Sequence, residues 1–230
     1  MKFEWKYFKG RIKLCREVIF SRLNLQTDFA GYAILLEHIK RHELYRLEGD
    51  AAEIGAFMGG GTRKLGKFFR RYGKNVIVVD VFDPESDHTK NERGEEMSYI
   101  YQMILGKRDL IGIFKRNIAH LSNVIVNRID SKQMVLNHDT KLCFSIIDGN
   151  HDPEYVRHDF ELVWARTVDG GTVAMHDYGG DLPQVTSEID GLINEHKDQI
   201  GAVETKPKHC FVFIRKLGGI VNERGRGGHN

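Results

Sequence analysis

Short apolar runs that alternate with helix-like segments constrain the fold of this 230-residue chain more than any other feature. Runs rich in Val and Ile occur at residues 75–82, 123–129, 142–148, 171–176 and 209–215. Each has the length of a strand and mostly lacks polar alternation, which is typical of strands covered by helices on both faces. The segments between them place apolar residues at helical spacing. This alternation predicts an α/β fold with a doubly wound, mostly parallel sheet and helices on both faces.

The rest of the chain is expected to flank one domain of residues 48–216. Residues 1–47 begin with a basic, aromatic segment and continue with apolar residues at helical spacing, which indicates an N-terminal helical extension. Residues 84–120 are longer than a simple crossover requires and are strongly charged in their first part. That segment suggests a lid, and a merely mobile insertion fits equally well. Residues 217–230 are rich in glycine and are predicted to be a disordered tail.

Composition gives little indication of a nucleic-acid or membrane partner. The net charge is +2, with 41% apolar and 29% charged residues, so bulk charge does not indicate nucleic-acid binding. The basic residues 1–22 leave a membrane or nucleic-acid contact open, but a solvated helix face is the preferred interpretation. Three cysteines without paired spacing, and the lack of a membrane-length apolar run or a signal peptide, indicate a cytoplasmic protein. The aromatic N-terminal segment is a candidate homo-oligomer surface.

A glycine-rich turn between a short strand and a helix marks the first candidate ligand site. The strand ends at Gly55, and residues 59–61 are all glycine. Glycines in such a turn let a ligand approach the backbone, and the helix N-terminus offers free N–H groups. The spacing from Gly55 to Thr62 matches a P-loop, except that Gly61 stands where the lysine must be. Phe57 replaces the second glycine of the dinucleotide pattern. Triphosphate and nicotinamide ligands are therefore disfavoured.

S-adenosylmethionine is the remaining ligand class, because it carries no phosphate and needs an acidic residue at its ribose. Asp80 follows the next strand, 25 residues after Gly55. Its carboxylate is predicted to accept both ribose hydroxyls. Capping of a loop is the alternative role for Asp80.

Polar residues follow two further strands. The run 142–148 ends in Asp148, and the run 171–176 ends in His176, with Asp177 next. Because ligand sites in open α/β sheets lie at the carboxyl ends of strands, these side chains are expected to meet if the strands are neighbours. Such a set can hold one divalent cation: oxygen ligands favour Mg²⁺ or Ca²⁺, whereas the histidine lets Mn²⁺, Fe²⁺ or Zn²⁺ compete. An ordinary turn before a helix start at Pro153 is the alternative.

Together these motifs resemble the class I S-adenosylmethionine-dependent methyltransferases. The similar branch contains macrolide sugar O-methyltransferases and cephalosporin hydroxylase-like proteins. Its pattern E-I-G-x-F-x-G-G-x-T is found at residues 53–62, D-G-x-H at 148–151 and H-D-Y at 176–178. The likeness spans about residues 48–216. It implies a Rossmann-like, seven-stranded sheet with a reversed last hairpin.

The resemblance also implies which residues bind the cofactor. Glu53, Gly55 and Thr62 would line its methionine end, and Asp130 and Ser131 would contact the adenine. Ile129 departs from the family, where a glycine commonly precedes this Asp. The full set of implied cofactor-binding residues is Glu53, Gly55, Phe57, Gly59, Gly60, Thr62, Asp80, Asp130, Ser131 and Asp148.

Catalysis is implied to use His151 as general base and Asp148, His176 and Asp177 as metal ligands. An unperturbed imidazole titrates near pH ~6.5, so it could accept a proton from a hydroxyl at neutral pH. The expected reaction is metal-assisted O-methylation of a small hydroxylated metabolite, such as a sugar. A non-catalytic or hydroxylase-like protein that binds a nucleoside cofactor is the alternative. The other histidines, His38 and His42 among them, show no recognisable ligand spacing.

Overall fold

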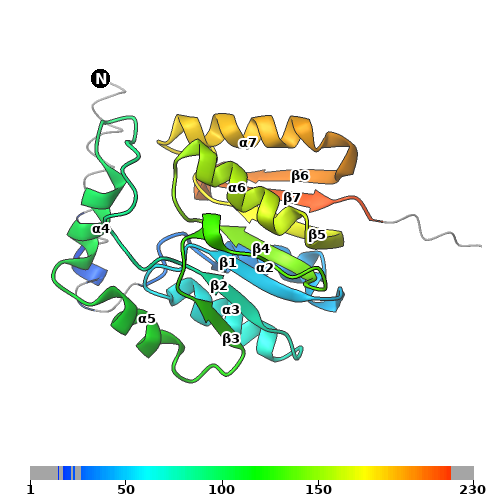
Figure 1. Cartoon of the computed structure of the whole chain (residues 1–230), viewed down its shortest axis with the longest axis horizontal. Coiled ribbons are helices and arrows are strands. Elements are labelled where there is room, and N and C mark those ends of the chain that lie inside the picture. The colour runs from blue at the N-terminus through cyan, green and yellow to red at the C-terminus, as the bar shows by residue number, and fades with distance from the viewer. Residues whose placement is uncertain (1–14, 16–17, 22, 24–26, 219–230) are drawn as a thin grey trace, which may run out of the picture.

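The computed structural model describes residues 15, 18–21, 23 and 27–218. Within them, seven strands form one sheet in the order β3-β2-β1-β4-β5-β7-β6 (Figure 1). All neighbours are parallel except β7, which runs antiparallel to β5 and β6. The predicted Rossmann-like fold with a reversed last hairpin is confirmed. The strands are β1 (Asp50–Ile54), β2 (Val76–Val79), β3 (Val124–Asn127), β4 (Leu142–Ile147), β5 (Thr167–Met175), β6 (Ile200–Lys206) and β7 (Phe211–Lys216).

Helices cover both faces of this sheet. The described α-helices are α2 (Ala33–Arg41), α3 (Gly60–Arg70), α4 (Met97–Leu105), α5 (Leu110–Ile118), α6 (Pro153–Trp164) and α7 (Pro183–Glu195). Short 3₁₀ turns are η1 (Leu44–Arg46), η2 (Ser131–Gln133), η3 (Lys197–Gln199) and η4 (Pro207–His209). The start of α6 shows why the helix begins where it does: the Asp152 carboxylate accepts a hydrogen bond from the Glu154 N–H at 2.9 Å, and Pro153 occupies the first turn.

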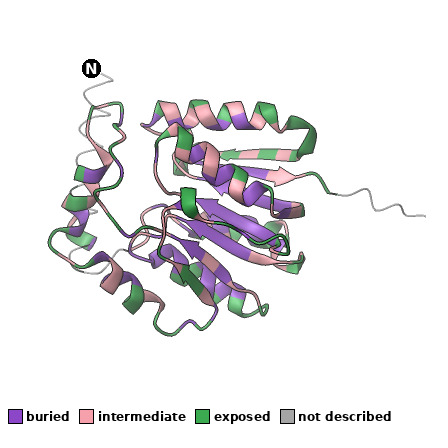
Figure 2. Ribbon diagram, viewed as in Figure 1, coloured by how far each residue is buried: buried purple, intermediate pink, exposed green. Residues whose placement is uncertain are grey.

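The apolar strands are buried because a hydrophobic layer packs on each face of the sheet. In β7, Phe211 and Phe213 pack into the layer that holds residues of α2, α3 and α5. The residues between them, Val212 and Ile214, pack into the layer formed with α6 and α7. Figure 2 shows the buried residues concentrated in the sheet between these layers. A strand covered on both faces therefore reads as a continuous apolar run.

The two edge strands depart from that pattern. β3 was expected to be covered on both faces, but Ile125 is 48% exposed, because the strand lies at the edge of the sheet. β6, at the opposite edge, alternates between half-buried and exposed residues. Its alternation explains why no apolar run marks it in the sequence.

The flanking segments take distinct positions. In the N-terminal segment, Tyr32, Leu35 and Ile39 are buried in the layer beneath the sheet. The segment 84–120 divides in two: α5 packs against α3, as a crossover between β2 and β3 does, whereas α4 stands at one end of the molecule. The tail from residue 219 onward lies outside the described residues. No helix within the described ranges has the length and apolar character that spanning a bilayer requires.

Candidate functional site

A cavity of about 370 Å³ lies at the carboxyl ends of the central strands. Four of the residues that line it directly follow a strand: Gly55 follows β1, Asp80 follows β2, Asp148 follows β4 and His176 follows β5. This is the position where open α/β sheets bind ligands. The volume is sufficient for a molecule the size of a nucleoside cofactor.

Asp80 forms part of the cavity wall and also fixes the glycine turn. Its Oδ2 atom accepts hydrogen bonds from the N–H groups of Ala56 at 2.7 Å and Phe57 at 2.9 Å. Its Oδ1 atom accepts one from the Phe82 N–H at 2.5 Å. A carboxylate offers about four acceptor positions, so roughly one remains, on Oδ1. In this arrangement Asp80 can accept one ribose hydroxyl, whereas the sequence analysis expected two.

The glycines of the turn are explained by contacts within the protein. A Cβ atom at Gly55 would collide with the backbone carbonyl of Asp148, and one at Gly60 with the backbone of Thr27. At Gly59 it would lie 2.6 Å from the Phe114 ring. The sequence analysis attributed these glycines to the approach of a ligand. The structure shows that protein atoms occupy the space beside all three.

Glu53 lies behind the cavity wall, in the protein interior. It is fully buried and accepts a hydrogen bond from the Tyr32 hydroxyl at 2.7 Å. Burial raises the pKa of Glu53 to about 8, against the opposing effect of the Thr62 and Tyr32 hydroxyls. Of the residues implied to bind the cofactor, those that do not line the cavity are Glu53, Gly59, Gly60 and Thr62. These four residues therefore act on a bound ligand only through neighbouring residues. Tyr32, which is hydrogen-bonded to Glu53, does line the cavity.

Glu53→Gln should flatten the pH dependence of stability. Because the folded pKa of Glu53 lies near 8, above its ordinary value of 4.5, the folded state holds a proton that the unfolded state releases. The free energy of unfolding therefore falls as pH rises between these values, by up to about 1.4 kcal/mol per pH unit. The glutamine keeps an acceptor for Tyr32 but cannot titrate. Urea unfolding at several pH values should show a shallower decline in the variant; equal slopes would contradict the prediction.

The adenine side of the cavity contains more polar groups than the sequence indicated. Asp130 and Ser131 both line it, and the Tyr155 hydroxyl donates to Asp130 Oδ2 at 2.8 Å. Asp159, on α6, is fully buried and lines the cavity, because its side of the helix faces the loop after β4. Burial raises the pKa of Asp159 to about 6.

Five titratable side chains meet at the ends of β4 and β5. His176 Nδ1 lies 3.0 Å from Asp148 Oδ1 and 3.0 Å from Asp177 Oδ2. His151 Nε2 lies 2.8 Å from the same Asp177 oxygen. The other ring nitrogen of His151, Nδ1, lies 2.6 Å from Asp87 Oδ2. The sequence analysis did not foresee Asp87, which comes from the segment before α4.

These contacts determine the charges of the two imidazoles. Burial opposes a positive charge on His151, but Asp177 and Asp87 outweigh it and raise its pKa to about 10. In the same way, Asp177 and Asp148 raise the pKa of His176 well above its ordinary value despite burial. The expectation of an unperturbed imidazole at His151 is therefore wrong for this arrangement. The neighbouring carboxylates thus favour the positively charged form of both rings.

The same side chains can hold a cation. Asp148, His151 and Asp177 each offer one ligand atom, and these atoms lie within 4.8 Å of one another. The predicted ligand His176 lies equally near both carboxylates. The structure therefore places two histidines, not one, beside the carboxylate pair.

A protein-family model described as a methyltransferase domain matches residues 52–178, more than half of the chain. The matched residues include the glycine turn, Asp80, Asp148 and Asp177. The chain belongs to the class I S-adenosylmethionine-dependent methyltransferases. The strand order and the position of the cavity agree with this assignment.

Solved structures share the fold of this methyltransferase at low sequence identity. CalS11, a calicheamicin methyltransferase, is 14% identical with a TM-score of 0.62, over 90% of this chain and 92% of its own. The O-methyltransferase NovP is 18% identical with a TM-score of 0.59, over 78% and 80%. A Clostridium thermocellum protein assigned as an rRNA methylase is 15% identical with a TM-score of 0.57, over 84% and 100%. These likenesses show the fold and do not determine the methyl acceptor.

The segment before α5 closes one side of the methyltransferase cavity. Residues from 84 to 104 contribute to the lining, including Asp87, Met97, Ile100 and Tyr101. The Tyr101 ring of α4 lies 5.4 Å from the Phe57 ring of the glycine turn. The segment therefore covers the cavity. That it opens as a lid stays a prediction.

Proposed function

We propose that this methyltransferase transfers a methyl group to a hydroxyl group of a small metabolite, with a divalent cation at the acceptor. The observation that carries the proposal is the group of carboxylates and imidazoles at the ends of β4 and β5. It lies in the same cavity as the glycine turn, Asp80 and Asp130. Side chains such as Met97 and Ile100 add an apolar wall, which suits a compact organic acceptor.

The proposed cation ligands are Asp148, His176 and Asp177, which come from the ends of neighbouring strands. His176 Nδ1 lies 3.0 Å from a carboxylate oxygen of each aspartate, so one oxygen-rich site with an imidazole ligand fits these positions. When bound there, a cation would polarise the acceptor hydroxyl and neutralise the Asp177 charge that raises the pKa of His151. Asp87 holds His151 Nδ1 and so turns Nε2 toward Asp177. His151 would then accept the hydroxyl proton at Nε2.

Calorimetric titration with S-adenosylmethionine and S-adenosylhomocysteine tests the cofactor site. We expect both to bind, and reduced nicotinamide cofactors not to compete. Asp80→Ala should weaken binding by at least about 10-fold, because it removes the remaining ribose acceptor and releases the N–H groups of Ala56 and Phe57 in the turn and of Phe82. Absence of binding at millimolar cofactor would refute the site. Binding without product from any hydroxylated acceptor in a broad screen would favour the non-catalytic alternative.

Separate titrations with Mg²⁺ and Mn²⁺ test which of the two histidines, His151 or His176, is the cation ligand. If His176 is the ligand, His176→Ala should weaken cation binding by at least about 10-fold, while His151→Ala keeps the affinity and loses turnover. The opposite pattern would make His151 the ligand. Unchanged cation binding in both variants would contradict an imidazole ligand at this site.

A further inference from the structure

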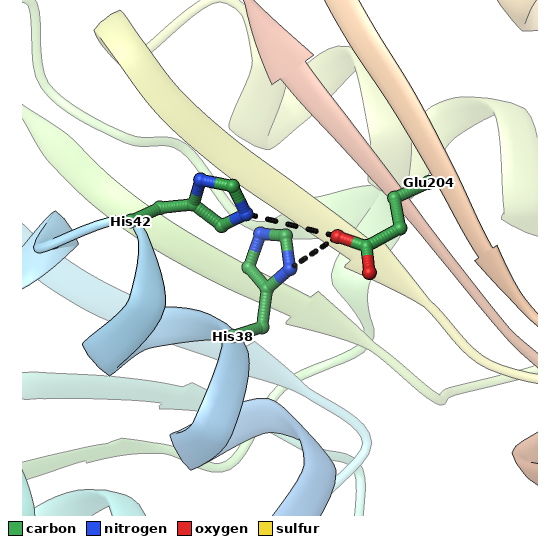
Figure 3. Close-up of side chains that lie close together, drawn as sticks. All are labelled: His38, His42 and Glu204. Atoms are coloured by element: carbon green, nitrogen blue, oxygen red, sulfur yellow. Dashed lines mark ion pairs between the residues drawn. The ribbon is translucent and has the colours of Figure 1, made fainter.

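A second group of potential metal ligands lies outside the cavity, where α2 meets the C-terminal hairpin. It consists of His38 and His42 at the end of α2 and Glu204 on β6 (Figure 3). The two histidines are four residues apart, so both rings leave the same side of the helix. All three residues lie apart from those that line the cavity. The methyltransferase reaction therefore does not account for them.

The distances match those between ligands of one small ion. His38 Nδ1 lies 3.2 Å from Glu204 Oε2, and His42 Nε2 lies 3.7 Å from the same oxygen. All three ligand atoms fall within 4.8 Å of one another. Tetrahedral Zn²⁺ with bonds of about 2.1 Å places its ligand atoms about 3.4 Å apart. The group thus supplies three of four tetrahedral positions with little movement.

Three of the four ring nitrogens of these histidines have no hydrogen bond within the described residues. His38 is 4% exposed, and its ring stacks on Phe213 at 4.0 Å between centroids. Neither of its ring nitrogens has a hydrogen bond within the described residues, and the same holds for His42 Nε2. Buried polar atoms are nearly always hydrogen-bonded or ligated. Two of these unsatisfied nitrogens, His38 Nδ1 and His42 Nε2, face the same carboxylate oxygen, which indicates a ligand between them.

Basic side chains contact one oxygen of the Glu204 carboxylate, and the two histidines face the other. Arg41 Nη1 lies 3.0 Å and Lys206 Nζ 2.5 Å from Oε1, so both bind the oxygen that faces away from the imidazoles. Arg215 Nη1 lies 3.5 Å from His42 Nδ1, the ring nitrogen that does not face Glu204. These positive charges disfavour Mg²⁺ and Ca²⁺, which depend on several charged oxygen ligands. A borderline ion that gains most from imidazole ligation is favoured.

We propose that His38, His42 and Glu204 bind Zn²⁺ and thereby tie α2 to the edge strand β6. The three protein ligands leave a fourth position for water. The ion would join residues more than 160 positions apart in the chain. Because it would bind the folded state only, it would stabilise the N-terminal helix against the sheet.

Zinc binding to full-length protein that has been treated with a chelator tests the site. All measurements use the Asp177→Asn variant as the background, because this change weakens the other potential metal site, in the cavity. This variant should bind one Zn²⁺ and gain about 5–10 °C in Tm when free Zn²⁺ is 100 times Kd. Adding His42→Ala or, separately, Glu204→Gln should weaken zinc binding by at least about 100-fold and abolish the thermal shift. Two different ligand variants are used so that misfolding of one leaves the other informative.

His88→Ala is the matched control, because His88 also pairs with a carboxylate, Glu96, at 2.6 Å but belongs to no group of three potential ligands among the described residues. It should bind Zn²⁺ as the background variant does, and Mg²⁺ should give no thermal shift in either. Unchanged zinc binding after His42→Ala and Glu204→Gln would overturn the proposal. So would the absence of zinc binding to the background variant.

Discussion

Asp177→Asn is expected to lower kcat/KM by roughly 150- to 5,000-fold. The Asp177 carboxylate contacts His151 at 2.8 Å and His176 at 3.0 Å, and it belongs to the proposed cation site. His176 and His151 hold the pKa of Asp177 well below its ordinary value despite burial, so the side chain acts as a charge. The amide keeps the shape but removes that charge. Loss of one partner from a buried ion pair costs about 3–5 kcal/mol, which corresponds to this loss of activity.

Product formation and cation affinity should be measured together for Asp177→Asn, with an acceptor found by screening. Asp198→Asn provides the control, because Asp198 is exposed in η3 and the same atoms are exchanged. It should retain the kcat/KM of the natural protein. An Asp177→Asn variant that keeps both turnover and cation binding would remove Asp177 from the reaction.

Gly55→Ala is expected to destabilise the fold by about 3 kcal/mol and lower Tm by roughly 6–12 °C. Gly55 has a φ of +83°, which an alanine adopts only at a cost of about 1–2 kcal/mol. The added methyl group would also collide with the Asp148 carbonyl on the neighbouring strand. Relief of that collision must displace Asp148 or the glycine turn, both of which line the cavity. Thermal unfolding and cofactor titration should both show the effect.

Gly73→Ala separates the two contributions. Gly73 has a similar φ of +67°, but a Cβ atom there meets no described atom within 4 Å. This variant should lose only the conformational part, about 1–2 kcal/mol, and should bind the cofactor normally. If both variants lost the same stability, the collision with Asp148 would not be a significant term.

The sequence predicts the buried strands well because burial on both faces leaves a continuous apolar run. β4 and β7 were identified in this way, and their residues are buried as expected. β6 has one exposed face and alternates instead, so only the family resemblance implied it. Ile125 in β3 illustrates the opposite error, since an apolar residue at a sheet edge looks the same in sequence as one in the centre.

The candidate site could be predicted only where its residues follow strands. Asp80, Asp148 and Asp177 were found because strand ends meet at one edge of a parallel sheet. Asp87 and Tyr32 reach their partners His151 and Glu53 across 64 and 21 positions, and nothing local marks such pairs.

The proposed zinc ligands could not be predicted from the sequence either, because they are also distant in the chain. The sequence analysis found no recognisable ligand spacing for His38 and His42, although the two residues lie four positions apart. Their third partner, Glu204, lies on the strand that the sequence does not reveal.

Asp87 connects the segment that covers the cavity with the proposed proton acceptor His151. It comes from the segment that covers the cavity, and its carboxylate fixes the orientation of His151. An exchange of this segment for that of a relative, made to admit a different acceptor, would also replace the group that aligns the proposed proton acceptor. Selectivity and turnover in this enzyme must therefore be redesigned together, with an aspartate retained at position 87.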